Sequence, residues 1–177
     1  MRILGVDPGL QITGYGLIET DGAAVRLLEG GVVRPDTSLS LERRLLILHE
    51  SISAIMGEFQ PDYVVVEELY AKYAHPRTAI LMGHARGTIL LAAAQRGIPF
   101  CGYEASLVKR SLTGNGRAPK TQVAQMVCRL LGLREPPSPE DVTDALALAL
   151  CHASPGRQVF RRARGRRGLP EAIARQL

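Results

Sequence analysis

The chain has 177 residues, of which 46% are hydrophobic and 22% are charged, and these proportions are typical of one globular domain. It contains neither an 18-residue apolar run nor a signal-peptide pattern at its start, which argues against a membrane protein and against export. Three widely spaced cysteines without a Cys-x-x-Cys pair favour buried thiols in a reducing cytoplasm over disulfides or a zinc site.

The net charge of +5 is concentrated at the C-terminal end of the chain. From residue 157 onward, seven Arg stand against one Glu and give +6, whereas the 15 basic and 16 acidic residues before it give −1. A Gly-interrupted arginine run cannot bury enough apolar surface to fold alone. We expect a folded domain over residues 1–154 and a flexible basic arm over 155–177 that binds polyanions, the alternative being a tail that only adds solubility.

Three consecutive strands are predicted at the start of the chain. Residues 2–6 form a short, mostly apolar run, which is typical of a strand covered on both faces. Residues 14–20 and 24–34 follow, and the Asp21-Gly22 turn between them indicates a hairpin.

Helices and strands alternate after this hairpin. Leu and Ile at helical spacing predict a helix over 40–59, with Ser38 and Ser40 as candidate caps. The remaining predicted elements are a strand within 60–68, a helix over 76–97, a strand over 98–104, and helices over 118–132 and 138–153. This order predicts an α/β domain with a mixed five-stranded sheet, in which three antiparallel strands precede parallel crossovers.

Acidic residues lie at or near the ends of several of these elements. Asp7 ends the first strand, Glu67 or Glu68 ends the fourth, and Asp141 and Asp144 share one face of the last helix. Because neighbouring strand residues point to opposite faces, only one of the two glutamates can join such a site. Four like charges at one sheet edge are costly unless divalent cations lie among them, and oxygen ligands favour Mg²⁺ or Mn²⁺.

Each of these carboxylates also has a purely structural interpretation. Asp7 precedes a Pro-Gly turn and could bond its backbone, and a glutamate could simply be the polar end of a strand. Asp141 stands three residues after Ser138 and could complete a helix cap. Asp144 is harder to explain in this way, since a charge inside the apolar run "DALALAL" is costly unless a cation offsets it.

Several stretches resemble the signature blocks of the RuvC family of crossover junction endodeoxyribonucleases, the bacterial Holliday junction resolvases with an RNase H-like fold. They are "ILGVDPGLQITGYG", "QPDYVVVEELYA", "ARG", "VKRSLTGNGRAPKTQV" and "DVTDALALA". The resemblance extends to about His152 and does not cover the arginine-rich tail. It implies that the catalytic, metal-binding carboxylates are Asp7, Glu67, Asp141 and Asp144.

The resemblance implies that two Mg²⁺ ions, for which Mn²⁺ substitutes, act on junction DNA. In the two-metal scheme the ions clamp the scissile phosphate, one making hydroxide from water and the other stabilising the leaving oxygen, and Asp7 bridges them. The expected products are 5′-phosphate and 3′-hydroxyl ends, formed by paired symmetric nicks in DNA recombination and repair.

The same resemblance places the DNA contacts. Tyr70 is expected to stack on a base opened at the junction, although strand-end packing is an alternative. A loop lysine, Lys109, and a helix lysine, Lys120, are expected to bind phosphate beside a Gly-rich stretch that also carries Arg117. An ordinary solvated loop between helices is the alternative for this stretch.

Two symmetric nicks need two active sites, so we expect a C2 homodimer, with the apolar helix over 76–97 as its interface. The branch-migration proteins RuvA and RuvB are partners by resemblance alone. Two rival functions stay open, namely an RNase H-like nuclease that acts on ribosomal RNA precursors and a non-catalytic junction-binding protein. An actin-like kinase is disfavoured, because its second phosphate loop and second domain do not fit this length.

Overall fold

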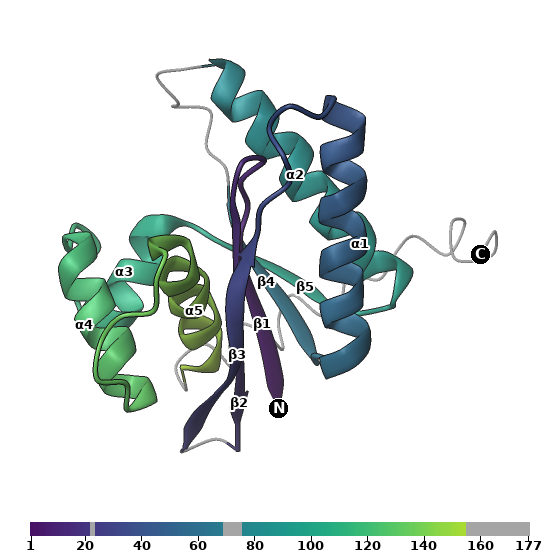
Figure 1. The fold of residues 1–177 in the computed structure, drawn as a ribbon. Helices are drawn as coiled ribbons and strands as arrows, with labels where there is room; N and C mark the ends of the chain where they lie inside the picture. The colour runs from purple at the N-terminus through teal and green to yellow at the C-terminus, as the bar shows by residue number, and fades with distance from the viewer. Residues whose placement is uncertain (22–23, 69–75, 155–177) are drawn as a thin grey trace, which may run out of the picture.

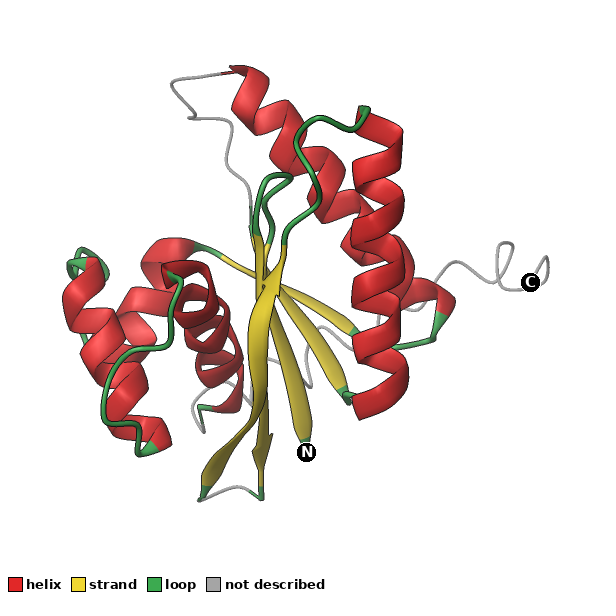
Figure 2. Ribbon diagram, viewed as in Figure 1, coloured by secondary structure: helices red, strands yellow, loops and turns green. Residues whose placement is uncertain are grey.

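The computed structural model describes residues 1–21, 24–68 and 76–154, and it contains a five-stranded sheet with helices on both faces (Figures 1 and 2). The strands are β1 (Arg2–Asp7), β2 (Thr13–Thr20), β3 (Val25–Val33), β4 (Tyr63–Glu67) and β5 (Phe100–Tyr103). They lie in the order β3-β2-β1-β4-β5. The first three pair antiparallel, whereas β4 pairs parallel with both β1 and β5. The predicted mixed sheet is confirmed.

The helices divide between the two faces of the sheet. They are α1 (Leu41–Phe59), α2 (Pro76–Gln95), α3 (Ala105–Thr113), α4 (Lys120–Leu131) and α5 (Glu140–Ala153). In Figure 1, α1 and α2 cover one face while α3, α4 and α5 lie on the other. The strand alternation follows this division, because Ile3 packs with the α5 side and Leu4 packs with the α1 and α2 side. The central strands are thus buried on both faces.

The sequence analysis omitted α3 and treated residues 105–113, which include Lys109, as a loop. The structure corrects this, since Val108 and Leu112 lie one helical turn apart and both are buried against the α5 side of the core. This short helix lacks a proline at its start and an acidic first turn, and Gly114 at its end is its main local signal. The predicted position of Lys109 in a loop was therefore wrong.

The predicted caps are only partly right. Ser40 is the N-cap residue of α1, but its hydroxyl bonds Glu42 instead of the helix backbone. The N-cap of α5 is Pro139, and no side chain caps that helix. A capping role for Ser138 or Asp141 therefore does not account for the acidic residues in α5.

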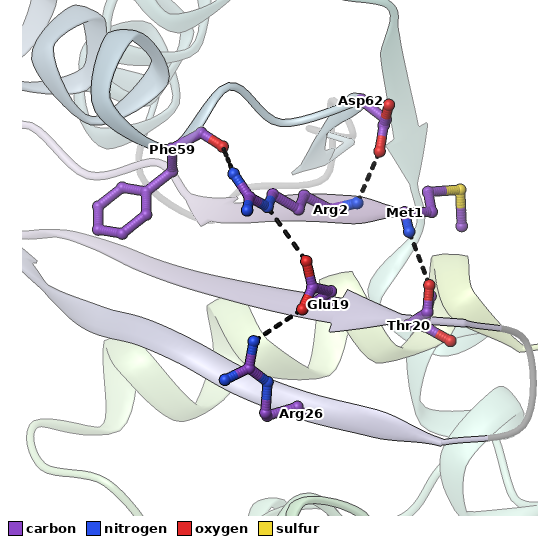
Figure 3. Close-up of polar contacts among 7 residues, drawn as sticks. All are labelled: Met1, Arg2, Glu19, Thr20, Arg26, Phe59 and Asp62. Atoms are coloured by element: carbon purple, nitrogen blue, oxygen red, sulfur yellow. Dashed lines mark hydrogen bonds and ion pairs between the residues drawn. The ribbon is translucent and has the colours of Figure 1, made fainter.

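Opposite charges meet at the amino end of β1 (Figure 3). The guanidinium of Arg2 donates to Glu19 Oε1 at 3.2 Å, and Arg26 donates to Glu19 Oε2 at 2.8 Å. The Arg2 backbone N–H donates to Asp62 Oδ2 at 2.7 Å, and its side chain donates to the carbonyl oxygen of Phe59 at 2.9 Å. These contacts tie β1 to β2, β3 and the turn before β4.

Some expectations concern residues outside the described ranges. Tyr70 and the basic arm over 155–177 lie outside the described residues, and their roles stay predictions. All three cysteines lie within the described ranges and no disulfide joins them, with Cys151 buried in the core. No helix in the described part of the chain has the length and apolar character that a bilayer span requires.

Candidate active site

The strand pairing brings Asp7 and Glu67 to the same edge of the sheet. The strands β1 and β4 run parallel, and Val6 pairs with Val66, so the two carboxylates follow at the same level at the carboxyl ends of adjacent strands. Two residues earlier, Gly5 pairs with Val65, and Val65 belongs to the core on the α5 side. Because side chains alternate along a strand, Asp7 and Glu67 also face α5.

Glycines in the sheet allow α5 to lie directly on β1 and β2. A Cβ atom on Gly5 would come within 2.0 Å of the carbonyl oxygen of Ala145, and one on Gly14 within 2.1 Å of that of Asp141. Gly14 is also the pairing partner of Asp7 across β1 and β2. The absence of a side chain at Gly14 therefore sets the first turn of α5 next to the end of β1, where Asp7 lies.

The two neighbouring glutamates after β4 point to opposite faces of the sheet. A Cβ atom on Gly102 would lie 2.7 Å from both Cγ and Oε1 of Glu68, so the Glu68 side chain lies over Gly102 in β5. Gly102 pairs with Val66, whose side chain belongs to the core under α1 and α2. Glu68 is therefore on the face opposite Glu67 and α5. This geometry supports Glu67 as the member of the pair that joins the other acids.

The four acidic residues act on one another electrostatically. Burial, and after it the charges of Glu67, Asp144 and Asp141 in that order, raise the pKa of Asp7 from its usual 3.8 to about 7. The pKa of Glu67 is also raised, first by burial and then by Asp144. The structure thus brings carboxylates from β1, β4 and α5 within electrostatic reach of one another, and their role as metal ligands stays a prediction.

A lysine lies beside this cluster. Lys120 is the first residue of α4, and its Nζ donates to Asp144 Oδ2 at 2.8 Å and to Glu140 Oε2 at 3.4 Å. The bond to Asp144 is the main reason why the pKa of Lys120 is raised. Sequence reasoning required a cation near Asp144 because a charge inside an apolar helix is costly, and Lys120 supplies it.

Two other predicted DNA-binding residues, Lys109 and Arg117, lie in the described part of the chain between β5 and α4. Lys109, on α3, is near enough to Glu67 to lower its pKa. Arg117 is exposed in the loop between α3 and α4, where its backbone N–H donates to Asn115 Oδ1 at 2.9 Å. The loop begins at Gly114, which ends α3 with a φ of 77°, a conformation that favours glycine. Of these two residues, Lys109 is therefore the one whose charge acts on a carboxylate of the cluster.

Sequence reasoning missed two arginines that hold the backbone near the acids. The Nε of Arg86, on α2, donates to the carbonyl oxygen of Glu67 at 3.3 Å, and its guanidinium lies 5.3 Å from the ring centre of Phe100. Arg44, on α1, donates to the carbonyl oxygen of Leu10, in the turn after Asp7, at 2.7 Å. For Arg86 the available signal was a charged residue within the largely apolar helix α2, the kind of signal that marked Asp144. Arg44 had no such signal, because α1 carries several other charged residues.

The donor set matches the chemistry of hard divalent cations. The cluster offers carboxylate oxygens, and its concentrated negative charge is the arrangement that a divalent cation stabilises. Within the described ranges, no three His, Cys, Asp or Glu side chains are drawn together closely enough to hold one ion. The acids therefore share an edge and an electrostatic field, while Asp144 is engaged by Lys120.

Comparisons with known proteins agree with this arrangement. A family model described as crossover junction endodeoxyribonuclease RuvC matches residues 3–152. Curated proteins with the same description are 47% identical over 149 residues in Rhodopirellula baltica, which is 84% of each chain, and 45% identical over 168 residues in Moorella thermoacetica, which is 94% of this chain and all of that one. The solved structure of Thermus thermophilus RuvC in complex with a Holliday junction substrate superposes with a TM-score of 0.85 at 38% identity, covering 90% of this chain and 96% of that one.

Proposed function

Because the chain belongs to the RuvC family of crossover junction endodeoxyribonucleases, we propose that it binds four-way junctions and resolves them by paired symmetric nicks in DNA recombination and repair. As a member of this family it is a nuclease of the RNase H-like fold and hydrolyses phosphodiester bonds. The observation that carries the proposal is the convergence of Asp7, Glu67, Asp141 and Asp144 on one sheet edge beside basic residues.

The four carboxylates are the proposed ligands of two Mg²⁺ ions, for which Mn²⁺ substitutes. When bound, such ions stabilise the charge that develops on the scissile phosphate and make water a better nucleophile, which leads to 5′-phosphate and 3′-hydroxyl ends. The chain itself supplies the charge and the rigidity. Asp7 is half-buried at the end of β1 and is acted on by the charges of the other three acids, so it would be a ligand of these ions, and Glu67 is fixed by the backbone of β4.

The basic residues near the acids are the proposed phosphate contacts. Lys109 on α3, Arg117 in the following loop and Lys120 at the start of α4 lie in consecutive segments of the chain. An exposed cation in this position offsets the repulsion between a DNA phosphate and the carboxylates. The aromatic ring of Tyr70, outside the described residues, is proposed to stack on an opened base.

A homodimer remains the proposed particle, with α2 at its interface. On α2, Ile80 is 60% exposed and Leu91 is 54% exposed, which supports an apolar surface that a second copy covers. Partnership with RuvA and RuvB, like the cytoplasmic location, rests on the expectations from the sequence.

The basic arm is proposed to bind phosphates without regard to DNA shape. Deleting residues 157–177, which carry +6, is expected to weaken binding to every DNA and to flatten its salt dependence while nicking survives. Junction and duplex affinities across a salt series measure this. An unchanged salt slope means that the arm does not contact DNA, and a loss confined to junctions means that it reads structure.

One assay tests the proposed function against its two rivals. Purified protein is incubated with a mobile four-way junction, a linear duplex of the same sequence and a structured RNA, each with Mg²⁺ or with a chelator. We expect symmetric nicks only in the junction, and only in the samples that contain Mg²⁺. Cleavage of the RNA instead supports the ribosomal RNA nuclease, and binding to the junction without any nick supports the non-catalytic protein.

A further inference from the structure

We infer that Lys120 is an internal counter-ion of the carboxylate cluster, so that a metal ion must displace its ammonium from Asp144 toward Glu140. The inference rests on the proposed metal binding by Asp7, Glu67, Asp141 and Asp144. It gives Lys120 a role in the protein without DNA, in addition to the proposed phosphate contact.

The first step is the position of the ammonium group. Lys120 starts α4 and its side chain is 63% exposed, yet its Nζ lies 2.8 Å from Oδ2 of Asp144, whose side chain is only 31% exposed. An isolated ion pair at a surface contributes little. Here the ammonium also favours the charged forms of Asp7 and Glu67, so one cation offsets the repulsion among several acids.

The second step is that Lys120 has another acidic partner outside the cluster. Its Nζ also lies 3.4 Å from Oε2 of Glu140, whose side chain is 80% exposed. Glu140 precedes Asp144 by four residues on α5 and therefore lies one turn away on the same helix face. The ammonium can release Asp144 and remain paired with Glu140. Lys120 therefore has two positions, and Asp144 is free to bind a metal ion in only one of them.

The third step is competition for the same oxygen atoms. A divalent cation bound by Asp144 and the ammonium of Lys120 repel each other, so the two cannot share that carboxylate closely. The measured metal affinity therefore includes the free energy of moving Lys120 away. Once it has moved, Lys120 stands at the edge of the cluster with its charge available to a phosphate.

Lys109 provides a matched comparison. It carries the same charge and also lies near Glu67, but within the described residues it forms no ion pair with an acid. Removing its charge changes the field around the cluster without freeing Asp144. A difference between Lys120 and Lys109 variants therefore reports on the contact with Asp144 and not on net charge.

The test measures Mn²⁺ binding to the full-length protein without DNA, from the loss of the free-ion EPR signal. Lys120→Met is expected to tighten the Kd on the order of tenfold, because the competitor for Asp144 is gone, whereas Lys109→Met is expected to change it by no more than about threefold. In chelator, Lys120→Met should also melt at a lower temperature than Lys109→Met. Saturating Mn²⁺ should remove that difference.

Glu140→Gln tests the alternative position of the ammonium. It should weaken Mn²⁺ binding in the wild-type background and have less effect when combined with Lys120→Met, since Glu140 acts through Lys120. Equal effects in both backgrounds overturn the two-position arrangement. Because Glu140 is exposed, this variant also serves if Lys120→Met does not fold.

The remaining outcomes show whether a failure concerns only the role of Lys120 or also the proposed metal site. An unchanged or weaker Kd in Lys120→Met, with binding abolished by Asp7→Asn, overturns the inference and leaves the metal site in place. Absence of binding in both wild type and Lys120→Met likewise overturns it, while the nicking assay still tests the function. Wild-type binding that survives Asp7→Asn contradicts both.

Discussion

The two ends of β1 place charged residues in opposite kinds of environment. At the amino end, the guanidinium groups of Arg2 and Arg26 pair with Glu19, and Asp62 accepts a hydrogen bond from the backbone N–H of Arg2 (Figure 3). At the carboxyl end, Asp7 is surrounded by other acids, and burial together with their charges raises its pKa to about 7. The strand is six residues long, so these two environments lie within one short element.

The difference shows which end of the sheet is organised for stability and which for chemistry. Exposed pairs such as Arg2 with Glu19 are balanced but contribute little to the free energy of folding. A cluster of buried like charges opposes folding and is retained where a ligand or a reaction requires it. The comparison predicts that neutralising an acid at the carboxyl end removes activity and adds stability, while the same change at the amino end does neither.

The largest expected effect distinguishes two adjacent residues. Glu67→Gln should lower junction nicking by more than a hundredfold, because even residues that only support metal ligands commonly contribute about 10- to 100-fold. Glu68→Gln should stay within about threefold of wild type, because the Glu68 side chain lies on the opposite face of the sheet, away from the cluster. Nicking rates of the two variants on one junction provide the measurement. The reverse pattern would place Glu68 in the site and contradict the strand register.

The second effect is a change in how stability depends on pH. Because the folded-state pKa of Asp7 lies above its value in the unfolded chain, its contribution to stability is present below about pH 4 and is lost as the pH rises through about 7. Asp7→Asn should therefore gain stability over wild type between pH 5 and pH 8, by about 2 to 3 kcal/mol in metal-free protein.

Urea unfolding in chelator at the two pH values measures this gain. The matched control is Glu19→Gln at the other end of β1, where hydrogen bonds from Arg26 and Arg2 lower the pKa of the carboxylate. That variant should lose a little stability at pH 8 and keep its nicking rate. An identical pH dependence in wild type and Asp7→Asn would mean that the acids do not repel one another in the folded protein.

A smaller effect concerns the approach of α5 to the sheet. A Cβ atom on Gly14 would meet the backbone of Asp141, so Gly14→Ala should force the first turn of α5 outward and cost about 1 to 3 kcal/mol of stability. Gly30→Ala is a milder comparison, since its Cβ would lie 3.1 Å from one side-chain atom, Cγ1 of Val142, and no closer than 3.6 Å to a backbone atom. Chemical denaturation compares the two, and equal losses would show that α5 is not held at Gly14.

Sequence reasoning located the acids because strand ends and helix faces are readable from pattern. The apolar run before Asp7 and the run "YVVV" before Glu67 both predicted buried parallel neighbours, and the alternation rule limited the site to one of the two glutamates. The structure confirms the sheet, and it places the acids within electrostatic reach of one another, while their role as metal ligands stays a prediction. Glu68 against Gly102 is the detail that distinguishes the pair.

What sequence reasoning could not provide depends on tertiary contacts. The helix α3 is only nine residues long and is stabilised by packing of Val108 and Leu112, so its local signals are weak. Arg86 reaches the backbone of Glu67 from the opposite face of the sheet, and no spacing in the sequence connects the two. The partner of Asp144 was expected to be a cation, but its identity as Lys120 required the packing of α4 beside α5.

Parallel nicking and binding assays on Asp7→Asn and Asp144→Asn test the central claim most directly, because these residues come from β1 and α5 and meet only in the folded site. Both variants are incubated with a synthetic four-way junction and Mg²⁺, and junction affinity is measured in the same buffer. The account predicts that nicking is abolished while junction binding is unchanged or tighter, since removing negative charge does not weaken attraction to phosphate. Cleavage close to the wild-type rate by either variant would contradict the assignment of this cluster as the catalytic metal site.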